Sequence, residues 1–179
     1  MMLRLATPAD VDGIIDVHVA SWKIGYRGIL PDRVLDEIDL NKRRARWLEA
    51  LSKPPQGRST LLCLDELQRM IGFATFGPAR GPGDHGDADV DPLRTAELIA
   101  CYVHPDHWRR GAGRLMCDEI FEQLHSRFQD IIVWVLRDNP RARGFYQSIG
   151  FIEEPGRQKP LPWDWHQAEL WEVRYRREL

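Results

Sequence analysis

Apolar residues recur along the chain at two spacings, and these spacings predict strands that alternate with helices. Val11, Ile14, Ile15 and Trp22 follow the period of a helix. Residues 131–136 are apolar at every position, as expected for a central strand covered on both faces. The pattern predicts strands at 2–6, 59–64, 70–76, 97–103, 131–136, 151–154 and 167–175, and helices ending near residue 22 and spanning 41–51 and 111–127, with a short helix after Asn139.

The segment 103–116, V-H-P-D-H-W-R-R-G-A-G-R-L-M, joins a predicted strand to a predicted helix. Gly111 and Gly113 let the backbone approach a ligand, and the free N–H groups of a first helical turn attract anions. The neighbouring arginines suit phosphate oxygens. The segment therefore indicates an anion site, although a tight turn that only starts a helix would carry the same glycines.

Composition narrows the class of protein. The chain has 179 residues, a formal charge of −2 and three cysteines. Near-neutral charge disfavours a nucleic-acid partner, and the length suits one compact domain. Cys63, Cys101 and Cys117 lie in apolar surroundings without metal-ligand spacing, so we expect reduced thiols in a cytoplasmic protein and no metal. No apolar run approaches the roughly 20 residues that span a bilayer, so we expect no membrane partner.

A second motif follows the predicted strand at 131–136. The order V-x-P, R-R-G-x-G, helix, apolar strand and N-x-x-A-x-x-F-Y-x-x-x-G-F lies within residues 97–151. This order resembles the GNAT superfamily of acyl-coenzyme A-dependent N-acetyltransferases. The residues that match the second motif are Asn139, Ala142, Phe145, Tyr146, Gly150 and Phe151.

The resemblance implies a fold and an activity. The expected fold is a single α/β (α+β) domain over residues 1–179, with a mixed, mostly antiparallel sheet of six to seven strands. About four helices flank that sheet, and one pair of strands splays around the cofactor. The expected reaction is direct transfer of acetyl from acetyl-coenzyme A to a primary amine. A non-catalytic acyl-coenzyme A sensor or partner-binding module on the same fold is the alternative.

The resemblance also implies where the cofactor binds. Backbone N–H groups of the glycine turn would hold the pyrophosphate, and the pantetheine arm would add to a strand edge. Relatives usually carry Arg or Gln where this chain has Trp108, so which arginine contacts phosphate is open. The cofactor-binding residues implied are Cys101, Tyr102, Val103, Arg109, Arg110, Gly111, Ala112, Gly113, Arg114 and Asn139.

Two residues are predicted to act in catalysis. Tyr146 matches the family position of the general acid, which gives a proton to the departing thiolate; a packing tyrosine is the other interpretation. Glu97 matches an acid that serves in some relatives as base through water and in others only orients the acceptor. Trp22 and Tyr26 are predicted to line the acceptor site. Trp163, Trp165 and His166 border that site in the family, or cover the core, or form a dimer contact.

The acceptor itself is not identified by the sequence. A small-molecule amine and a peptide amine are both open, as is whether the chain forms a homodimer. The segment 77–92 is rich in glycine, proline and aspartate. We interpret it as a solvated loop, and its alternative role is a negative lip for a cationic substrate, formed by Asp84, Asp87, Asp89 and Asp91.

Overall fold

One mixed sheet of seven strands organises the computed structural model, which describes residues 1–81, 86–161 and 170–179. The strand order is β1-β2-β3-β4-β5-β7-β6, and β4–β5 is the one parallel pair in the described part of the chain. The strands are β1 (Met2–Leu5), β2 (Ser59–Leu64), β3 (Met70–Pro78), β4 (Thr95–Val103), β5 (Asp130–Leu136), β6 (Ile152–Pro160) and β7 (Trp171–Glu178).

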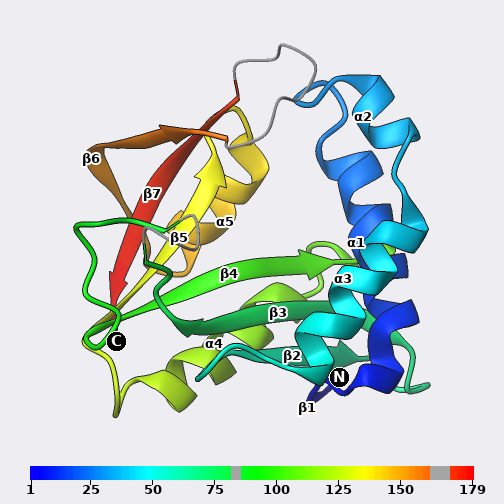
Figure 1. Ribbon diagram of the computed structural model, residues 1–179, viewed down its shortest axis with the longest axis horizontal. Coiled ribbons are helices and arrows are strands. Elements are labelled where there is room, and N and C mark those ends of the chain that lie inside the picture. The colour runs from blue at the N-terminus through cyan, green and yellow to red at the C-terminus, as the bar shows by residue number, and fades with distance from the viewer. Residues whose placement is uncertain (82–85, 162–169) are drawn as a thin grey trace.

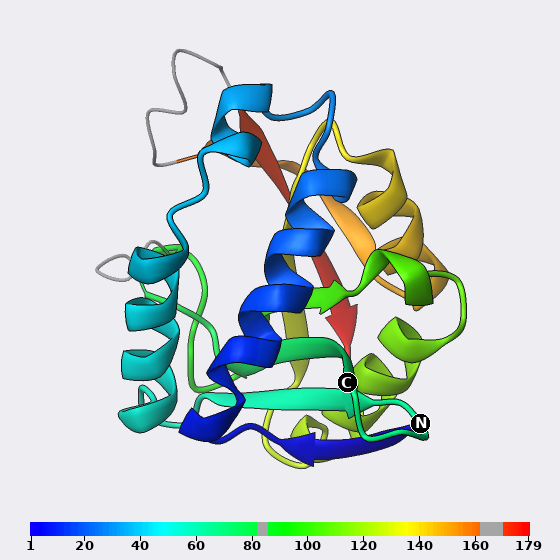
Figure 2. The same cartoon turned by 90° about the vertical axis from the view of Figure 1, so that its right-hand side faces the viewer.

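Helices cover both faces of the sheet. On one face α1 and α3 lie side by side, and Ile14 and Val17 of α1 pack on Leu62 and Phe73 of the strands (Figure 2). On the other face α4 buries a stripe that includes Met116 in the largest core cluster. The helices are α1 (Val11–Gly25), α2 (Asp32–Asp36), α3 (Leu40–Ser52), α4 (Ala112–Leu124) and α5 (Pro140–Ser148), with short 3-10 turns at Pro8–Asp10 and Pro105–His107.

Strands β4 and β5 begin side by side and then diverge (Figure 1). They pair only from Thr95 to Glu97, opposite residues 130–132 of β5. Towards β3 the register shifts, so that Ile99 is an extra residue in β4 between the pairs at Leu98 and Ala100. Such a bulge bends the strand and increases its twist. The rest of β4, as far as Val103, therefore presents an edge that β5 does not cover.

The structure confirms the predicted fold class and most predicted elements. Three expectations differ from the structure, and the simplest is that β7 ends at Glu178 instead of residue 175. The short helix α2 was not predicted, because its five residues carry too little periodicity to separate it from a loop. Strand β6 continues to Pro160 instead of ending at residue 154. It pairs with β7 at Ile152 and again near Lys159, with an irregularity between them that breaks the alternating pattern.

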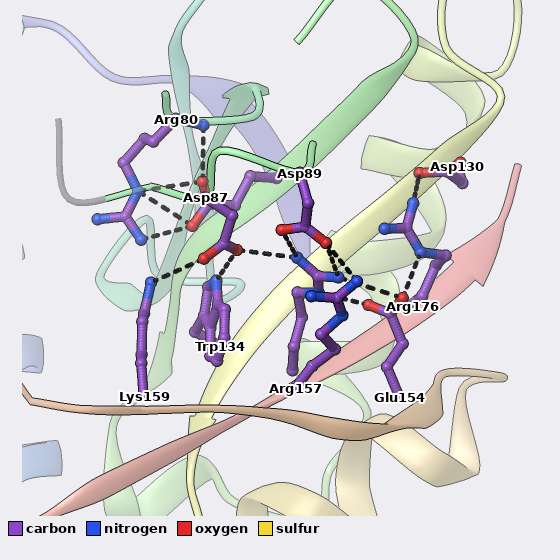
Figure 3. Close-up of polar contacts among 11 residues, drawn as sticks. Arg80, Asp87, Asp89, Asp130, Trp134, Glu154, Arg157, Lys159 and Arg176 are labelled. Atoms are coloured by element: carbon purple, nitrogen blue, oxygen red, sulfur yellow. Dashed lines mark hydrogen bonds and ion pairs between the residues drawn. The ribbon is translucent and has the colours of Figure 1, made fainter. Parts of the chain in front are cut away.

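An ion-pair network holds the segment 86–91 against the α1 face of the sheet (Figure 3). The guanidinium of Arg174 in β7 is almost fully buried and contacts the carboxylates of Asp87, Asp89 and Glu154. Burial lowers the pKa of Arg174, and the hydrogen bonds to these acids more than offset that effect, so its pKa is raised. Two of the four lip aspartates thus neutralise a buried cation; Asp84 lies outside the described residues.

Candidate active site

The turn before α4 has the geometry of an anion cradle. Gly111 is the N-cap of α4, with a left-handed φ of 87°, and a Cβ added there would meet no atom within 4 Å. The first helical hydrogen bond runs from Leu115 N–H to the Gly111 carbonyl. The backbone N–H groups of residues 112–114 therefore remain available to a ligand, at the positive end of a 13-residue helix.

Trp108 fixes this turn to the end of β4. Its indole Nε1 donates to the Val103 carbonyl at 2.6 Å, and Ser21 of α1 donates its hydroxyl to the same oxygen at 2.8 Å. The guanidinium of Arg141 in α5 stacks 4.1 Å from the centre of the Trp108 ring. The residue that departs from the family pattern thus anchors the turn through its side chain.

The predicted arginines of the turn divide into two groups. Arg109 and Arg110 are exposed, and neither pairs with a carboxylate among the described residues. Arg114 donates to the Ser148 carbonyl at 2.7 Å, so its guanidinium caps the end of α5. Arg141 was missed by the sequence reasoning, because only the folded chain brings the start of α5 next to Trp108. Asn139 accepts from Ala142 N–H and so caps α5, as predicted for the helix start.

Tyr146 lies beside the uncovered edge of β4. Its ring is buried, and it belongs to the core cluster against which Cys101 of β4 packs. Burial raises the pKa of the Tyr146 hydroxyl, and the nearby thiols of Cys101 and Cys117 add to the effect. The phenol is therefore protonated at neutral pH and able to donate a hydrogen bond.

An aromatic cluster lines the other face of β4. The hydroxyls of Tyr26 and Tyr102 lie 3.4 Å apart, and the rings of Trp22 and Tyr26 meet edge to face at 5.4 Å. The two residues predicted to line the acceptor site thus meet the side chain of Tyr102, a residue predicted to bind cofactor. Trp163, Trp165 and His166 lie outside the described residues, so their predicted roles stay predictions.

Glu97 is held by an arginine instead of facing open space. Its carboxylate is 1% exposed and accepts from the Arg80 backbone N–H and guanidinium, each at about 3.0 Å. To take a proton from a substrate, Glu97 would have to loosen these contacts. Its role as a base stays a prediction.

Glu172 is an acid that the sequence reasoning missed. It lies on β7 opposite Leu136 of β5 and is partly buried. Its carboxylate has no hydrogen-bond or ion-pair partner among the residues described. Burial raises the pKa of Glu172, although the cations of Lys159 and Arg80 oppose it, and its charge in turn raises the pKa of Tyr26. No signal in the sequence marks it, because β7 also carries Glu178 and three arginines that look like a solvated face.

A second missed group is a partly buried histidine on α1. The imidazole of His18 touches Tyr102 at 4.6 Å between ring centres, and one ring nitrogen accepts from the indole of Trp47 at 3.3 Å. Arg43 of α3 places its Nη1 3.1 Å from both ring nitrogens. Burial, together with this cation, lowers the pKa of His18 to about 3, so the ring is neutral at physiological pH.

Within residues 1–81, 86–161 and 170–179, no three His, Cys, Asp or Glu side chains are grouped as metal ligands. None of the helices in these ranges has the length and apolar character needed to cross a membrane.

Comparisons with known proteins agree with this geometry. The family model described as "Acetyltransferase (GNAT) family" matches residues 24–151. An uncharacterized N-acetyltransferase of Bacillus subtilis, YuaI, is 31% identical over 147 residues, covering 82% of this chain and 77% of that protein. The L-amino acid N-acyltransferase MnaT of Escherichia coli is 26% identical over 156 residues, covering 85% of this chain and 80% of that protein.

A solved structure shares the whole fold. The PaiA N-acetyltransferase from Thermoplasma acidophilum, in complex with coenzyme A, superimposes with a TM-score of 0.72 at 18% identity, covering 100% of both chains. The fold and the site thus define an acyltransferase. The chain belongs to the acetyltransferase (GNAT) family.

The partly buried His18 predicts a dependence of stability on pH. Because its pKa is depressed in the folded state, the unfolded chain binds the proton first as pH falls below about 6.5. Between pH 7 and pH 5 this group alone should lower the free energy of unfolding by about 2 kcal/mol. Urea titrations of wild type and His18→Asn should show a correspondingly smaller pH dependence in the variant.

The matched control for that experiment is His125→Asn, at an exposed position near the end of α4. This substitution should leave the pH dependence of the wild type intact. Equal pH dependence in wild type and His18→Asn would contradict the assignment.

Proposed function

We propose that the protein transfers an acetyl group from acetyl-coenzyme A to a primary amine. The observation that carries this proposal is the juxtaposition of three features: the open turn at Gly111, the edge of β4 that β5 leaves uncovered, and the protonated Tyr146 beside it. The turn suits the pyrophosphate of the cofactor, the strand edge suits its extended arm, and Tyr146 suits its thioester.

The chain's own residues fit the cofactor. Backbone N–H groups of residues 112–114 can bind pyrophosphate oxygens, with Arg109, Arg110 and Arg141 supplying charge. The backbone of 101–103, apart from the Val103 carbonyl that accepts from Trp108 and Ser21, can pair with the amides of a pantetheine arm, as an added strand pairs with a sheet edge. Bound acetyl-coenzyme A would supply the activated thioester.

Tyr146 donates the proton that the leaving group takes up. The acceptor nitrogen attacks the thioester carbonyl, the C–S bond breaks, and the sulfur receives the proton of the Tyr146 hydroxyl. The phenolate then recovers a proton released from the acylated nitrogen or from solvent. A thiol has a pKa of about 8.5, so a protonated phenol assists departure while the C–S bond is breaking.

Glu172 takes the role of base, and Glu97 the orienting role that the family also allows. An amine with a pKa near ~10.4 is mostly charged at neutral pH and must lose a proton before attack. Glu172 is partly buried, carries a raised pKa and has no partner in the described part of the chain, whereas Glu97 is engaged by Arg80. A group without competing hydrogen bonds accepts a proton more readily.

The acceptor is an amine of a small molecule or of a peptide. MnaT is named for L-amino acids, and a Salmonella typhimurium relative is named for the alanine of a ribosomal protein. The predicted cytoplasmic location agrees with both. A non-catalytic acyl-coenzyme A sensor or partner-binding module on the same fold is the alternative, and thiol release separates it from an enzyme.

Gly111 tests cofactor binding. Replacing Gly111 with Asp puts a carboxylate where the pyrophosphate should lie, and Gly111→Asn is a control of equal shape without charge. Both side chains tolerate a left-handed φ. Acetyl-coenzyme A affinity, measured by calorimetry, should be at least ~10-fold weaker for Asp than for Asn, on the order of 1.4 kcal/mol. Equal affinities in two folded variants would argue against a pyrophosphate at this turn.

Tyr146→Phe tests whether the hydroxyl acts as the general acid, and thiol release by wild type tests whether the protein is an enzyme. Wild type should release thiol from acetyl-coenzyme A when given amino acids, diamines or short peptides. Without the hydroxyl, kcat should fall by at least ~10²-fold, about 2.7 kcal/mol, while cofactor affinity stays nearly unchanged. A kcat within about threefold of wild type would make Tyr146 a packing residue. No thiol release by wild type with any amine would favour the sensor.

The pH profile identifies the base. For an amine with a high pKa, log kcat/KM should rise with pH at slope one, because the amine must lose a proton. Below the raised pKa of Glu172 the slope should be steeper, because Glu172 must lose a proton as well. Glu172→Gln should lose the steeper limb and lower kcat/KM by about 10²-fold, the lower end of the range for acid–base catalysis. Glu97→Gln should keep that limb. The opposite result would return the role of base to Glu97.

A further inference from the structure

A large cavity lies between α1, α3 and the sheet. Its volume is about 1040 Å³, enough for a drug-sized molecule. His18 and Trp22 of α1 and Trp47 of α3 form its aromatic walls, and Thr75 and Ala100 lie on the strands beneath. Figure 2 shows α1 in front of the strands, with α3 beside it. The cavity is therefore apolar and aromatic at its inner end.

The rim of the cavity carries more cations than anions. Among its acids, Glu37 is paired with Arg33 at 3.1 Å, and Asp39 accepts from the backbone of Lys42 at the start of α3. The charged lining residues are Arg33, Lys42, Arg43, Arg46, Lys53 and Arg58 against Glu37, Asp39 and Glu49. This excess of positive charge favours a ligand with an anionic group over a ligand with only positive charges.

Arg43 is the cation that reaches furthest into this lining. Its guanidinium lies 4.5 Å from the centre of the Trp22 ring and contacts the ring nitrogens of His18. Among the residues that the structure describes, no carboxylate pairs with it. Burial lowers the pKa of Arg43. A partly buried guanidinium that meets an indole ring and a neutral imidazole but no carboxylate can bind an anion.

The cavity extends to the bulge of β4, next to the residues where transfer is proposed. Ile99, the extra residue of the β4 bulge, lies on its wall together with Ala100. The ring of His18 is 4.6 Å from that of Tyr102, whose hydroxyl is 3.4 Å from that of Tyr26. One molecule can therefore contact Arg43 at one end and approach β4 at the other.

We propose that this cavity binds the acceptor, and that Arg43 binds a carboxylate or phosphate that the acceptor carries besides its amine. The inference rests on the proposed function and adds the class of acceptor: an amine with an anionic group, of which an amino acid is the simplest case. A polyamine with only positive charges does not fit a rim of this character.

The turnover experiment compares acceptors that differ in charge alone. The probes are L-alanine, L-leucine, L-phenylalanine and L-glutamate, the amide of each, phosphoethanolamine as the phosphate arm, and putrescine. Wild type should use at least one acid or the phosphate with kcat/KM at least ~10-fold above its neutral or cationic counterpart.

Arg43→Gln should lose that preference, Arg43→Lys should keep part of it, and Arg44→Gln should keep all of it. Arg44 is the matched control, since it is exposed and pairs with Asp12 on the same helix pair.

A binding measurement tests Arg43 even if wild type turns over no amine. The N-acetyl derivatives of the four amino acids, their amides and N-acetylphosphoethanolamine are titrated by calorimetry, with coenzyme A present. Tighter binding of at least one anion than of its neutral partner in wild type, lost in Arg43→Gln only, supports the inference. Equal binding of each pair in wild type, or an unchanged preference in folded Arg43→Gln, overturns it. Absence of turnover by itself counts against the proposed function alone.

Discussion

The short parallel ladder between β4 and β5 determines how the rest of the site is arranged. Three residues of pairing, followed by divergence and a bulge at Ile99, leave backbone donors and acceptors of β4 without a strand partner on one side. Unpaired backbone groups away from water are unfavourable, so such an edge needs either solvent or a ligand. An extended amide-containing arm satisfies it in the way that an added strand would. Tyr146 approaches this edge from the α4 face, and Tyr26 and Tyr102 lie on the α1 face.

Charges on the two halves of the molecule are handled differently. Around β5 to β7, Arg174 and Arg80 are paired with Asp87, Asp89 and Glu97, so the acids of that region are neutralised internally (Figure 3). Breaking such a buried pair costs about 3–5 kcal/mol, which makes these residues supports of the site. Glu172 and Arg43 differ, since each is partly buried without an opposite charge in contact among the described residues. A partly buried charge without an opposite charge in contact is available to bind a ligand.

The sequence predicted the local features well and the long-range ones poorly. The glycine turn, the Asn139 cap and the apolar strands depend on neighbouring residues, and the structure has them where they were expected. The contact between Arg141 and Trp108, 33 positions apart, follows from chain folding and leaves no periodic signal. For the same reason the sequence did not show that an arginine holds Glu97. Its partner Arg80 lies in a glycine- and proline-rich segment whose path no periodicity reveals.

The spacing of aromatic residues on α1 relates the two ends of the site. His18, Trp22 and Tyr26 follow one another at intervals of four, so they lie along one side of the helix and its end. Eight residues of helix rise about 12 Å, which limits the distance between a group held at Arg43 beside His18 and an amine beside Tyr26. An amino acid spans only part of this length, and a dipeptide or a larger side chain spans more of it. Because α1 also anchors the glycine turn through Ser21 and Val103, one helix positions the acceptor and the cofactor turn together.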